Sequence, residues 1–237
     1  MFVIGGVQKT SLVDFPHRVA AVVFTQGCNF RCGYCHNPLL IYPPLEGGSK
    51  SLISGRGVIE DFLSFLKTRI GKLDGVVITG GEPTLQSGLY NFIKEIKQMG
   101  FEVKLDTNGT NPEVVERLIN DNLLDYIAMD IKAPLDKYDL ITNTNINKDN
   151  ILQTIKLIKN SKIDYEFRTT VVKSQLSFND FEKIGQMIKG AKRYYLQKFV
   201  SSEILDKNLK NSQTYTDQEF KTLCRNLKKY VEIVNYR

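Results

Sequence analysis

The chain has 237 residues, of which 42% are hydrophobic, so it can bury a substantial core in one large α/β domain or two small ones. Its net charge is +6, but the basic residues are scattered without a long basic run, which gives no support for a nucleic-acid-binding tail. No apolar stretch approaches the ~18 residues of a membrane span, and the first residues lack the features of a signal peptide. We therefore expect a cytoplasmic protein whose partners include neither nucleic acid nor a membrane.

Short apolar, β-branched runs alternate along the chain with amphipathic stretches of helical period. The predicted strands are 18–25, 74–79, 101–106, 125–131, 165–172 and 194–200. The predicted helices are 58–69, 86–99, 112–121, 149–160, 178–189 and 216–229. This alternation predicts parallel strands joined by right-handed crossovers, in an open sheet or a partial barrel, and the periodicity does not decide between the two.

The chain shows no internal repeat beyond this unit and no clear linker. We expect a single domain over 1–237, with a core over about 18–200 and a C-terminal helical extension over about 201–237. The segment 38–57 contains two adjacent prolines and two adjacent glycines, which predicts a long loop that could serve as a lid.

Three of the four cysteines lie within eight positions, in the run Cys28-Asn-Phe-Arg-Cys32-Gly-Tyr-Cys35. This clustering is unlike a disulfide framework and predicts a metal site in a reducing compartment. Three thiolates with C-x3-C-x2-C spacing can ligate three irons of a four-iron cluster, which leaves the fourth iron without a protein ligand. A cluster with an open position can bind and reduce a small molecule.

Two other metal centres match part of this motif. A structural zinc site usually has four protein ligands in paired knuckles, whereas only His36 lies near enough in the sequence to be the fourth. Residues 32–36 also have the C-x-x-C-H spacing of c-type haem attachment, which is typical of exported proteins and leaves Cys28 without a role. The iron–sulfur cluster is therefore the favoured interpretation, with His36 beside the ligands rather than among them.

Further candidate residues follow the predicted strands. Gly80-Gly81-Glu82-Pro83 follows the second strand, Asp106-Thr-Asn-Gly109 the third, and Asp130-Ile-Lys132 ends the fourth. Active groups gather at the carboxyl ends of parallel strands, so we expect these residues and the cysteines to converge. The segment 106–109 is also an ordinary turn sequence, and Asp130 and Lys132 could simply form an ion pair.

The C-x3-C-x-aromatic-C motif, followed one βα unit later by Gly-Gly-Glu-Pro, resembles the radical S-adenosylmethionine (SAM) superfamily. The resemblance implies a partial (β/α)6 barrel of parallel strands and a [4Fe–4S] cluster held by Cys28, Cys32 and Cys35. In this superfamily SAM chelates the open iron, and electron transfer from the reduced cluster cleaves the sulfonium. The resulting 5′-deoxyadenosyl radical abstracts a hydrogen atom, while the protein binds, orients and excludes water.

The resemblance also implies which residues contact SAM. Tyr34 would lie against the adenine, the glycines and Glu82 would bind the methionyl ammonium, and Lys132 would lie near the carboxylate. Arg168 would face the barrel interior, where it must meet an acidic group because a buried, unpaired arginine is costly. The full expected set is Tyr34, Asn37, Gly80, Gly81, Glu82, Asp106, Asn108, Asp130, Lys132, Arg168 and Gln197.

Three further stretches resemble the glycyl radical enzyme activases: residues 5–16 (GGVQKTSLVDFP), 25–28 (TQGC) and 35–38 (CHNP). The fit is best to activating proteins of the anaerobic ribonucleoside-triphosphate reductase, in the longer form similar to pyruvate formate-lyase activating enzyme. The implied reaction is abstraction of a glycine Cα hydrogen from the partner, with flavodoxin or ferredoxin as reductant. A single cysteine set suits a reaction that needs one hydrogen abstraction.

Other interpretations stay open at this point. The partner could be pyruvate formate-lyase or another glycyl radical enzyme. A radical SAM enzyme for a small molecule would need a closed pocket, whereas an activase needs a mouth that admits a peptide loop. A non-catalytic iron–sulfur protein would hold a cluster without SAM turnover. The fourth cysteine, Cys224, lies on the apolar face of the last predicted helix, so we expect it to be structural.

Overall fold

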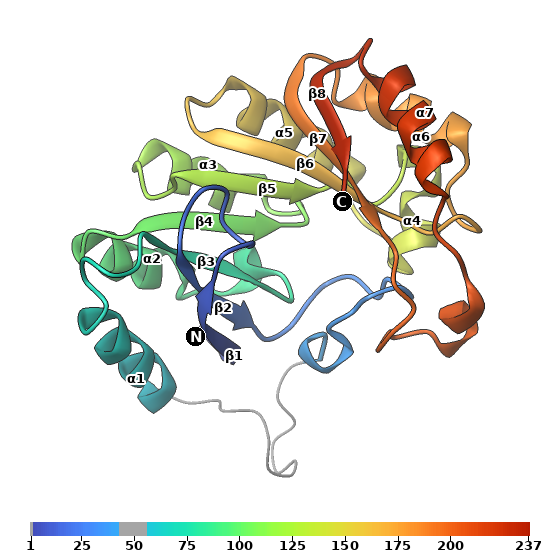
Figure 1. The fold of residues 1–237 in the computed structure, drawn as a ribbon. Helices are drawn as coiled ribbons and strands as arrows, with labels where there is room; N and C mark the ends of the chain where they lie inside the picture. Colours follow the sequence, from blue (N-terminus) through green and yellow to red (C-terminus); the bar gives the residue numbers. More distant parts are fainter. Residues whose placement is uncertain (1, 43–55) are drawn as a thin grey trace. The chain divides into compact units, whose positions relative to one another are not determined.

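The structure is a computed structural model that describes residues 2–42 and 56–237 (Figure 1). Most of the predicted loop 38–57 lies outside the described residues, and so does the lid expectation. The described part of that segment begins with a short 3-10 helix, η1 (Pro38–Leu40).

Within the described residues the strands form one sheet with the order β1 to β8 (Figure 1). The strands are β1 (Ile4–Ser11), β2 (Ala20–Thr25), β3 (Gly75–Gly80), β4 (Glu102–Thr107), β5 (Tyr126–Asp130), β6 (Asp164–Val171), β7 (Ala191–Lys198) and β8 (Val231–Tyr236). β1 pairs antiparallel with β2, whereas β2–β3, β3–β4, β6–β7 and β7–β8 are parallel pairs. The predicted α/β fold with a mostly parallel sheet is confirmed.

The helices alternate with these strands as predicted. They are α1 (Arg56–Lys67), α2 (Leu89–Gln98), α3 (Pro112–Asn120), α4 (Tyr138–Thr142), α5 (Lys148–Asn160), α6 (Phe178–Met187) and α7 (Asp217–Leu227), with 3-10 turns η2 (Pro83–Leu85), η3 (Leu135–Lys137) and η4 (Lys207–Asn211). Side-chain caps define where several helices begin. Ser177 forms a capping box at the start of α6, and Thr216 forms one at the start of α7. In the described part of the chain, no helix has the length and apolar character needed to cross a membrane.

All six predicted strands and six predicted helices are present, with boundaries shifted by a few residues. β1, β8 and α4 were not predicted. β1 is an edge strand with a largely exposed middle, and α4 has only five residues, so neither carries a clear periodic signal. The expected helical extension after 200 contains α7, but it also contributes β8, which pairs with β7.

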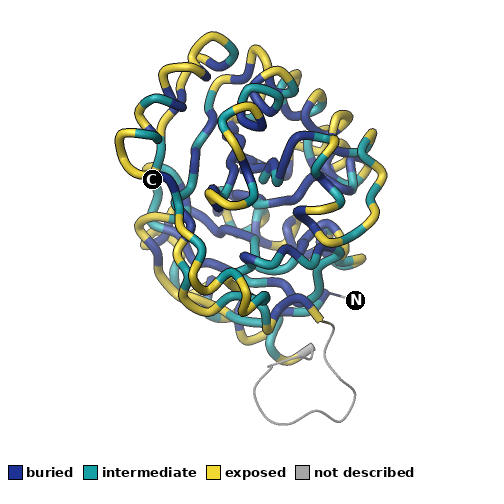
Figure 2. The backbone as a smooth tube through the Cα atoms, turned by 90° about the vertical axis from the view of Figure 1, so that its right-hand side faces the viewer, coloured by how far each residue is buried: buried dark blue, intermediate teal, exposed yellow. Residues whose placement is uncertain are grey.

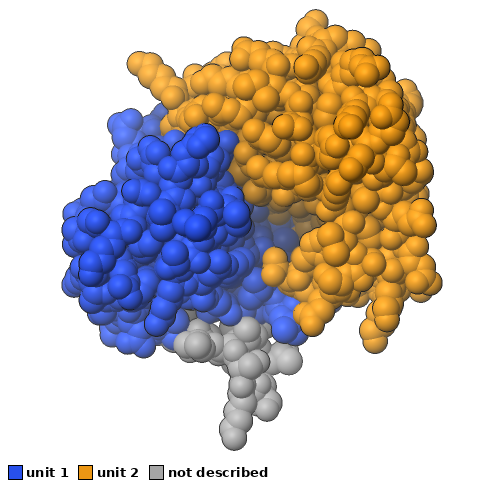
Figure 3. All heavy atoms as spheres, viewed as in Figure 1, with its two compact units in different colours: residues 1–29, 39–107, 113–127 blue, residues 30–38, 108–112, 128–237 orange. Residues whose placement is uncertain are grey.

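The chain forms two compact units (Figure 3). The first comprises residues 1–29, 39–107 and 113–127, and the second comprises 30–38, 108–112 and 128–237. β1 to β4 belong to the first unit, β6 to β8 belong to the second, and β5 contributes residues to both. The expectation of a single domain stays a prediction.

Each unit has its own core, which Figure 2 shows as the dark blue segments of the backbone. In the first unit, residues 20–23 and 76–78 are fully buried, as expected for β-branched runs in a parallel sheet covered on both faces. In the second unit the core is aromatic, with Tyr165 and Phe167 of β6 in a tilted contact of 5.4 Å between ring centroids. The Tyr194 hydroxyl donates to Thr169 Oγ1 at 2.7 Å, which satisfies a buried polar group.

Candidate active site

In the first unit, the backbone that enters the cysteine motif is held by hydrogen bonds. The N–H of Gly27 donates to the carbonyl oxygen of Leu40 at 2.7 Å, and the N–H of Cys28 donates to that of Ile41 at 3.0 Å. Gly27 adopts φ +91°, a conformation that favours glycine. The position of Cys28 within this unit is therefore fixed by η1 and the residues after it, and the residue is half-buried and forms no disulfide.

The Gly-Gly-Glu-Pro motif lies directly against the same backbone. The N–H of Gly81 donates to the Thr25 carbonyl oxygen and that of Glu82 to the Gly27 carbonyl oxygen, both at 2.8 Å. A Cβ atom on Gly81 would lie 2.0 Å from the Gly27 oxygen, and one on Gly80, at φ +107°, would lie 2.4 Å from the Thr25 nitrogen. Both positions therefore require glycine, because any side chain would separate the two loops.

Glu82 is only 1% exposed, and one of its carboxylate oxygens is the centre of a buried network. Oε1 accepts hydrogen bonds from the Thr84 N–H at 3.1 Å, the Thr84 hydroxyl at 2.6 Å and the Thr107 hydroxyl at 2.7 Å. The carboxylate thereby caps η2 and ties the loop after β3 to the end of β4. Its predicted contact with the SAM ammonium stays a prediction.

Asp106 lies near the end of β4, and Asn108 is the first residue after that strand. The two residues belong to different units. Asp106, in the first, accepts from the Thr79 hydroxyl at 3.3 Å and forms an ion pair with the buried Lys104. Asn108, in the second, is buried, and its Oδ1 accepts from the N–H and the hydroxyl of Thr110 at 3.1 and 2.8 Å. The Asn108 side chain thus closes a turn at 108–110, directly after β4, whereas Asp106 and Thr107 still belong to the strand.

In the second unit, Cys32 and Cys35 lie at the two ends of a tight turn, where the Cys35 N–H donates to the Cys32 carbonyl oxygen at 3.0 Å. The unpredicted helix α4 supports the start of this loop. The Arg31 N–H donates to the Thr142 carbonyl oxygen at 2.8 Å, and the Phe30 ring meets that of Tyr138 edge-on at 6.2 Å. Both thiols are free.

The segment after β7 packs against this turn. The Asp206 N–H donates to the Gly33 carbonyl oxygen at 2.8 Å, and a Cβ on Gly33 would lie 3.0 Å from Asp206 Cβ. The His36 ring stacks on Phe199 at 6.0 Å, and its Nε2 donates to the Val200 carbonyl oxygen at 2.7 Å. We call residues 199–211 the strap. His36 thus lies beside the cysteines, as expected, and Asn37 is exposed.

Three charged side chains of the expected SAM set form one cluster in the second unit. Asp130 accepts from Arg168 Nε through Oδ1 at 2.8 Å and from Lys132 Nζ through Oδ2 at 3.0 Å. Burial disfavours the charged carboxylate, but the neighbouring Arg168 and Lys132 outweigh it and hold the pKa of Asp130 well below its usual range. Asp130 likewise raises the pKa of Lys132, against the effect of burial. The acidic partner that Arg168 requires is therefore Asp130.

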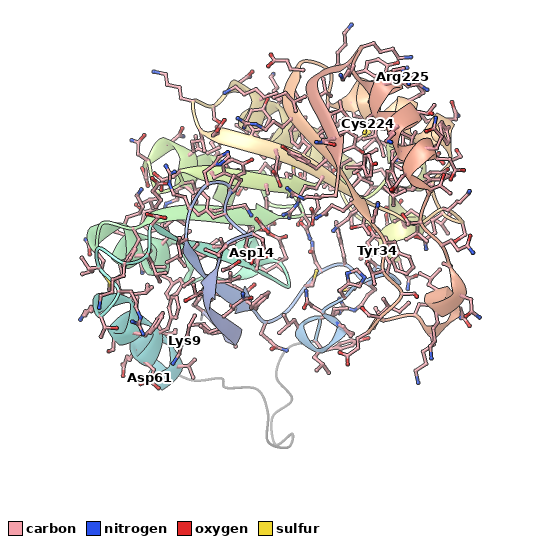
Figure 4. All side chains as sticks on the ribbon, viewed as in Figure 1. Lys9, Asp14, Tyr34, Asp61, Cys224 and Arg225 are labelled. Atoms are coloured by element: carbon pink, nitrogen blue, oxygen red, sulfur yellow. The ribbon has the colours of Figure 1, made fainter. Side chains whose placement is uncertain are left out.

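Tyr34 and Cys32 lie close enough to this cluster to interact with it electrostatically. Burial raises the pKa of the Cys32 thiol, and the Lys132 charge opposes that rise. Burial also places the pKa of Tyr34 well above its usual range. Tyr34 is labelled in Figure 4, and its hydroxyl is buried and has no hydrogen-bond partner among the described residues. Gln197 pairs in register with Thr170, on the strand face that carries Arg168.

The donor atoms present fit an iron–sulfur cluster and SAM. None of the three motif cysteines is in a disulfide, and cysteine is the ligand that such clusters take. The unsatisfied Tyr34 hydroxyl and the Lys132 ammonium offer polar groups to a bound ligand. Over residues 2–42 and 56–237, no three His, Cys, Asp or Glu side chains are already grouped for a metal ion; Cys28 belongs to the first unit and the other two cysteines to the second.

Several supporting residues were not predicted. Gln86 donates to the Gln26 carbonyl oxygen at 2.6 Å and accepts from the Val3 N–H at 2.9 Å, which ties β1 to the motif loops of the first unit. The Tyr138 hydroxyl accepts from the Lys132 N–H at 3.2 Å. These contacts join positions far apart in the sequence or lie in short elements, so no spacing in the sequence announces them.

The family model described as "Radical SAM superfamily" matches residues 22–188 of this chain, which is more than half of its length. The chain therefore belongs to the radical SAM superfamily. It is an enzyme, and its cofactors are those of the superfamily, a [4Fe–4S] cluster and SAM. The predicted enzyme class and cofactors are confirmed.

The relatives narrow this class. The chain is 34% identical over 239 residues to the "Putative glycyl-radical enzyme activating enzyme MJ1227" of Methanocaldococcus jannaschii, covering 99% of this chain and 95% of that protein. It is 29% identical over 189 residues to the pyruvate formate-lyase-activating enzyme of Clostridium pasteurianum, covering 78% and 76%. Within the superfamily, the chain belongs to the family of glycyl-radical enzyme activating enzymes.

Solved structures share the fold. A domain of a pyruvate-formate lyase-activating enzyme from Bacteroides vulgatus matches with a TM-score of 0.56 and 18% identity, over 69% of this chain and 98% of that one. Streptococcus suis SuiB bound to S-adenosylmethionine matches with a TM-score of 0.64 and 15% identity, over 90% of this chain and 48% of that one. Both likenesses concern the fold alone.

Proposed function

We propose that this enzyme generates the glycyl radical of an anaerobic ribonucleoside-triphosphate reductase. The observation that carries the proposal is the match over nearly the whole chain to a protein named as a glycyl-radical enzyme activating enzyme. The stretches 5–16, 25–28 and 35–38, which resemble activators of the reductase, support this particular partner. The single cysteine set supports one hydrogen abstraction rather than a longer reaction sequence.

When bound, the cluster and SAM supply a one-electron cleavage of the sulfonium and a radical that removes one hydrogen atom. The chain's own residues bind and orient. Cys28, Cys32 and Cys35 ligate three irons, and the buried Tyr34 lies against the adenine. Lys132 meets the SAM carboxylate, held in place by Asp130, whose other oxygen is occupied by Arg168.

The remaining proposed contacts come from the residues expected to bind SAM. The loop of Gly80, Gly81 and Glu82 binds the SAM ammonium, because its close packing leaves a fixed backbone next to a buried negative charge. Asn37, Asp106, Asn108 and Gln197 complete the proposed set.

We propose flavodoxin or ferredoxin as the electron donor. The chain carries a net charge of +6, and a positive field raises the rate of encounter with acidic redox proteins of this kind. The absence of a disulfide among the three motif cysteines and the iron–sulfur centre also support the predicted location in a reducing cytoplasm.

The second candidate partner is pyruvate formate-lyase or another glycyl radical enzyme. It is favoured by the identity of 29% to 32% with pyruvate formate-lyase-activating enzymes. An electron paramagnetic resonance experiment separates the candidates. The reconstituted, reduced enzyme is mixed with SAM and with either purified reductase or purified lyase, and the glycyl doublet is quantified.

The proposal predicts a doublet with the reductase that a Cys32→Ala variant does not produce. A doublet with the lyase alone would show that the partner is the lyase rather than the reductase, and the proposed reaction would stand. No doublet with either, under conditions where SAM is cleaved, would turn the search to a small-molecule substrate. A loaded cluster without SAM cleavage would contradict the enzymatic account.

A further inference from the structure

Gln26, two residues before Cys28, is a buried polar residue whose backbone is held on both sides in the first unit. Its N–H donates to the Val3 carbonyl oxygen at 3.1 Å, and its own carbonyl oxygen accepts from Gln86 Nε2 at 2.6 Å. The side chain of Gln26 therefore extends from a point that the segments before β1 and after η2 keep in place.

The carboxamide of Gln26 binds the segment 39–42 at both of its ends. Nε2 donates to the Leu39 carbonyl oxygen at 3.1 Å and also to that of Tyr42. A primary amide has two N–H donors, so one group can serve both acceptors. Oε1 is buried and has no hydrogen-bond partner among the described residues, so the two bonds from Nε2 carry the polar contact of this side chain.

The same segment accepts the backbone hydrogen bonds of the residues that enter the cysteine motif. The Gly27 N–H donates to the Leu40 carbonyl oxygen, and the Cys28 N–H donates to that of Ile41. These two acceptors lie between the two that bind Gln26. Three consecutive residues thus donate to four consecutive carbonyl oxygens, and the outer two of those bonds come from a single side chain.

Packing against β1 limits the positions that this carboxamide can adopt. A Cβ on Gly5 would lie 2.8 Å from Gln26 Oε1 and 2.4 Å from Leu40 Cδ2. The side chain and the segment that it binds are therefore both packed against the backbone of β1. A long polar side chain loses rotamer freedom when it is packed in this way, so the group is held in its bonding position.

We propose that Gln26 is a positioning residue for the cluster ligand Cys28. By holding both ends of the segment 39–42, it keeps the carbonyl oxygens of that segment within reach of the Gly27 and Cys28 N–H groups. Those bonds in turn fix the backbone that carries the Cys28 sulfur. The inference rests on the proposed function, in which Cys28 ligates iron.

The first measurement is amide hydrogen exchange in the cluster-free protein, which does not depend on iron. Gln26→Met keeps the length of the side chain but removes both donors, so exchange at Gly27 and Cys28 should accelerate about tenfold while exchange in β3 stays unchanged. Gln26→Asn keeps the carboxamide but shortens its reach by one methylene, and it should change exchange in the same direction. Wild-type exchange at Gly27 and Cys28 in both variants would overturn the inference.

The second measurement follows the loss of iron from the reconstituted enzyme to the chelator bathophenanthroline, under anaerobic conditions and without SAM. Gln26→Met should lose iron about tenfold faster than the wild type, because groups that orient a metal ligand affect metal affinity by about this factor or more. The matched control is Lys97→Met, in the same unit. It removes two hydrogen bonds from an amine to the Asp125 carboxylate, at 2.8 and 2.6 Å, and should lose iron at the wild-type rate.

Iron loss from Gln26→Met at the wild-type rate would overturn the inference. An equal acceleration in Gln26→Met and Lys97→Met would also overturn it, because that pattern indicates a general loss of stability. Cys28→Ala tests the proposed function separately. If that variant kept its cluster as firmly as the wild type, Cys28 would not be a ligand, and the proposed ligand set would fail whatever Gln26→Met showed.

Discussion

In the first unit, the loop of Gly80 and Gly81 packs tightly against the backbone that leads into Cys28, and this contact gives the sharpest stability prediction. Replacing Gly81 by alanine adds a Cβ that would lie 2.0 Å from the Gly27 carbonyl oxygen and 2.7 Å from its carbon. Both contacts are with backbone, so no side-chain rotation relieves them. The loop after β3 must move away from the residues that lead into Cys28.

The magnitude follows from what this movement breaks. The hydrogen bonds from Gly81 to Thr25 and from Glu82 to Gly27, both 2.8 Å long, are each worth about 0.5–1.5 kcal/mol. Overpacking in a tightly filled region adds about 1–3 kcal/mol. We therefore expect a loss of about 2–6 kcal/mol, or a fall in melting temperature on the order of 10 °C for a chain of this size.

The assay is anaerobic thermal unfolding of the cluster-free protein, followed by circular dichroism, so that cluster loading does not affect the comparison. Gly57→Ala is the matched control, because a Cβ there would meet no heavy atom within 4 Å. Gly57 is the second residue of α1, where alanine should be neutral or slightly stabilising. The argument would be refuted if Gly81→Ala melted within about 2 °C of Gly57→Ala, since a shift that small corresponds to less than ~1 kcal/mol.

Three further predictions follow from other contacts. Glu82→Ala removes the acceptor of three hydrogen bonds and should cost about 2–4 kcal/mol in urea unfolding, whereas Glu82→Gln, which keeps an oxygen, should cost clearly less; equal losses would contradict the network. Because the pKa of Asp130 is lowered in the folded chain, its ion pairs stabilise the fold above the unfolded pKa of about 3.9 and lose that effect as the pH falls below it. The stability difference between the wild type and Asp130→Asn should therefore be constant from about pH 5 to 8 and shrink in acid, and a difference that grew in acid would contradict the assignment. His36→Phe keeps the ring stacked on Phe199 but removes the hydrogen bond to Val200, so amide hydrogen exchange in the strap should accelerate about fivefold, while exchange in α5 stays unchanged; an unchanged strap would show that this bond does not hold it.

The sheet and its crossover helices could be predicted because the relevant signals are long and regular. Buried runs such as 20–25 and 75–80 are continuous and β-branched, and the helices between them repeat apolar residues at helical spacing. β1 and β8 were not predicted because they are edge strands, which are partly exposed and lack a continuous apolar run. The five residues of α4 are too few to show a period.

The candidate site likewise contains some features that local sequence motifs indicate and others that only the folded chain shows. The cysteines and the Gly-Gly-Glu-Pro loop were predicted from local motifs, and the need of Arg168 for an acidic partner from the cost of burying a charge. The partner's identity, Asp130, lies 38 positions away. The Gln86–Gln26 bond spans 60 positions and the Glu82–Thr107 bond 25, so these contacts exist only once the chain is folded.

The glycine pair has a packing role that the sequence motif alone does not indicate. Gly80 and Gly81 were expected, with Glu82, to bind the SAM ammonium, and this stays a prediction. The structure adds a packing requirement, because each Cβ would meet backbone of residues 24–27. This requirement holds whether or not SAM is bound, which is why the stability of the cluster-free protein can test it.

The central claim is that this enzyme cleaves SAM in order to take the Cα hydrogen of a glycine in a partner protein. The most direct measurement uses anaerobic ribonucleotide reductase produced with Cα-deuterated glycine, mixed with the reduced enzyme and SAM, and mass spectrometry of the 5′-deoxyadenosine formed. The account predicts 5′-deoxyadenosine that carries one deuterium, in step with the glycyl doublet. Unlabelled 5′-deoxyadenosine, formed at the same rate with and without the reductase, would contradict it.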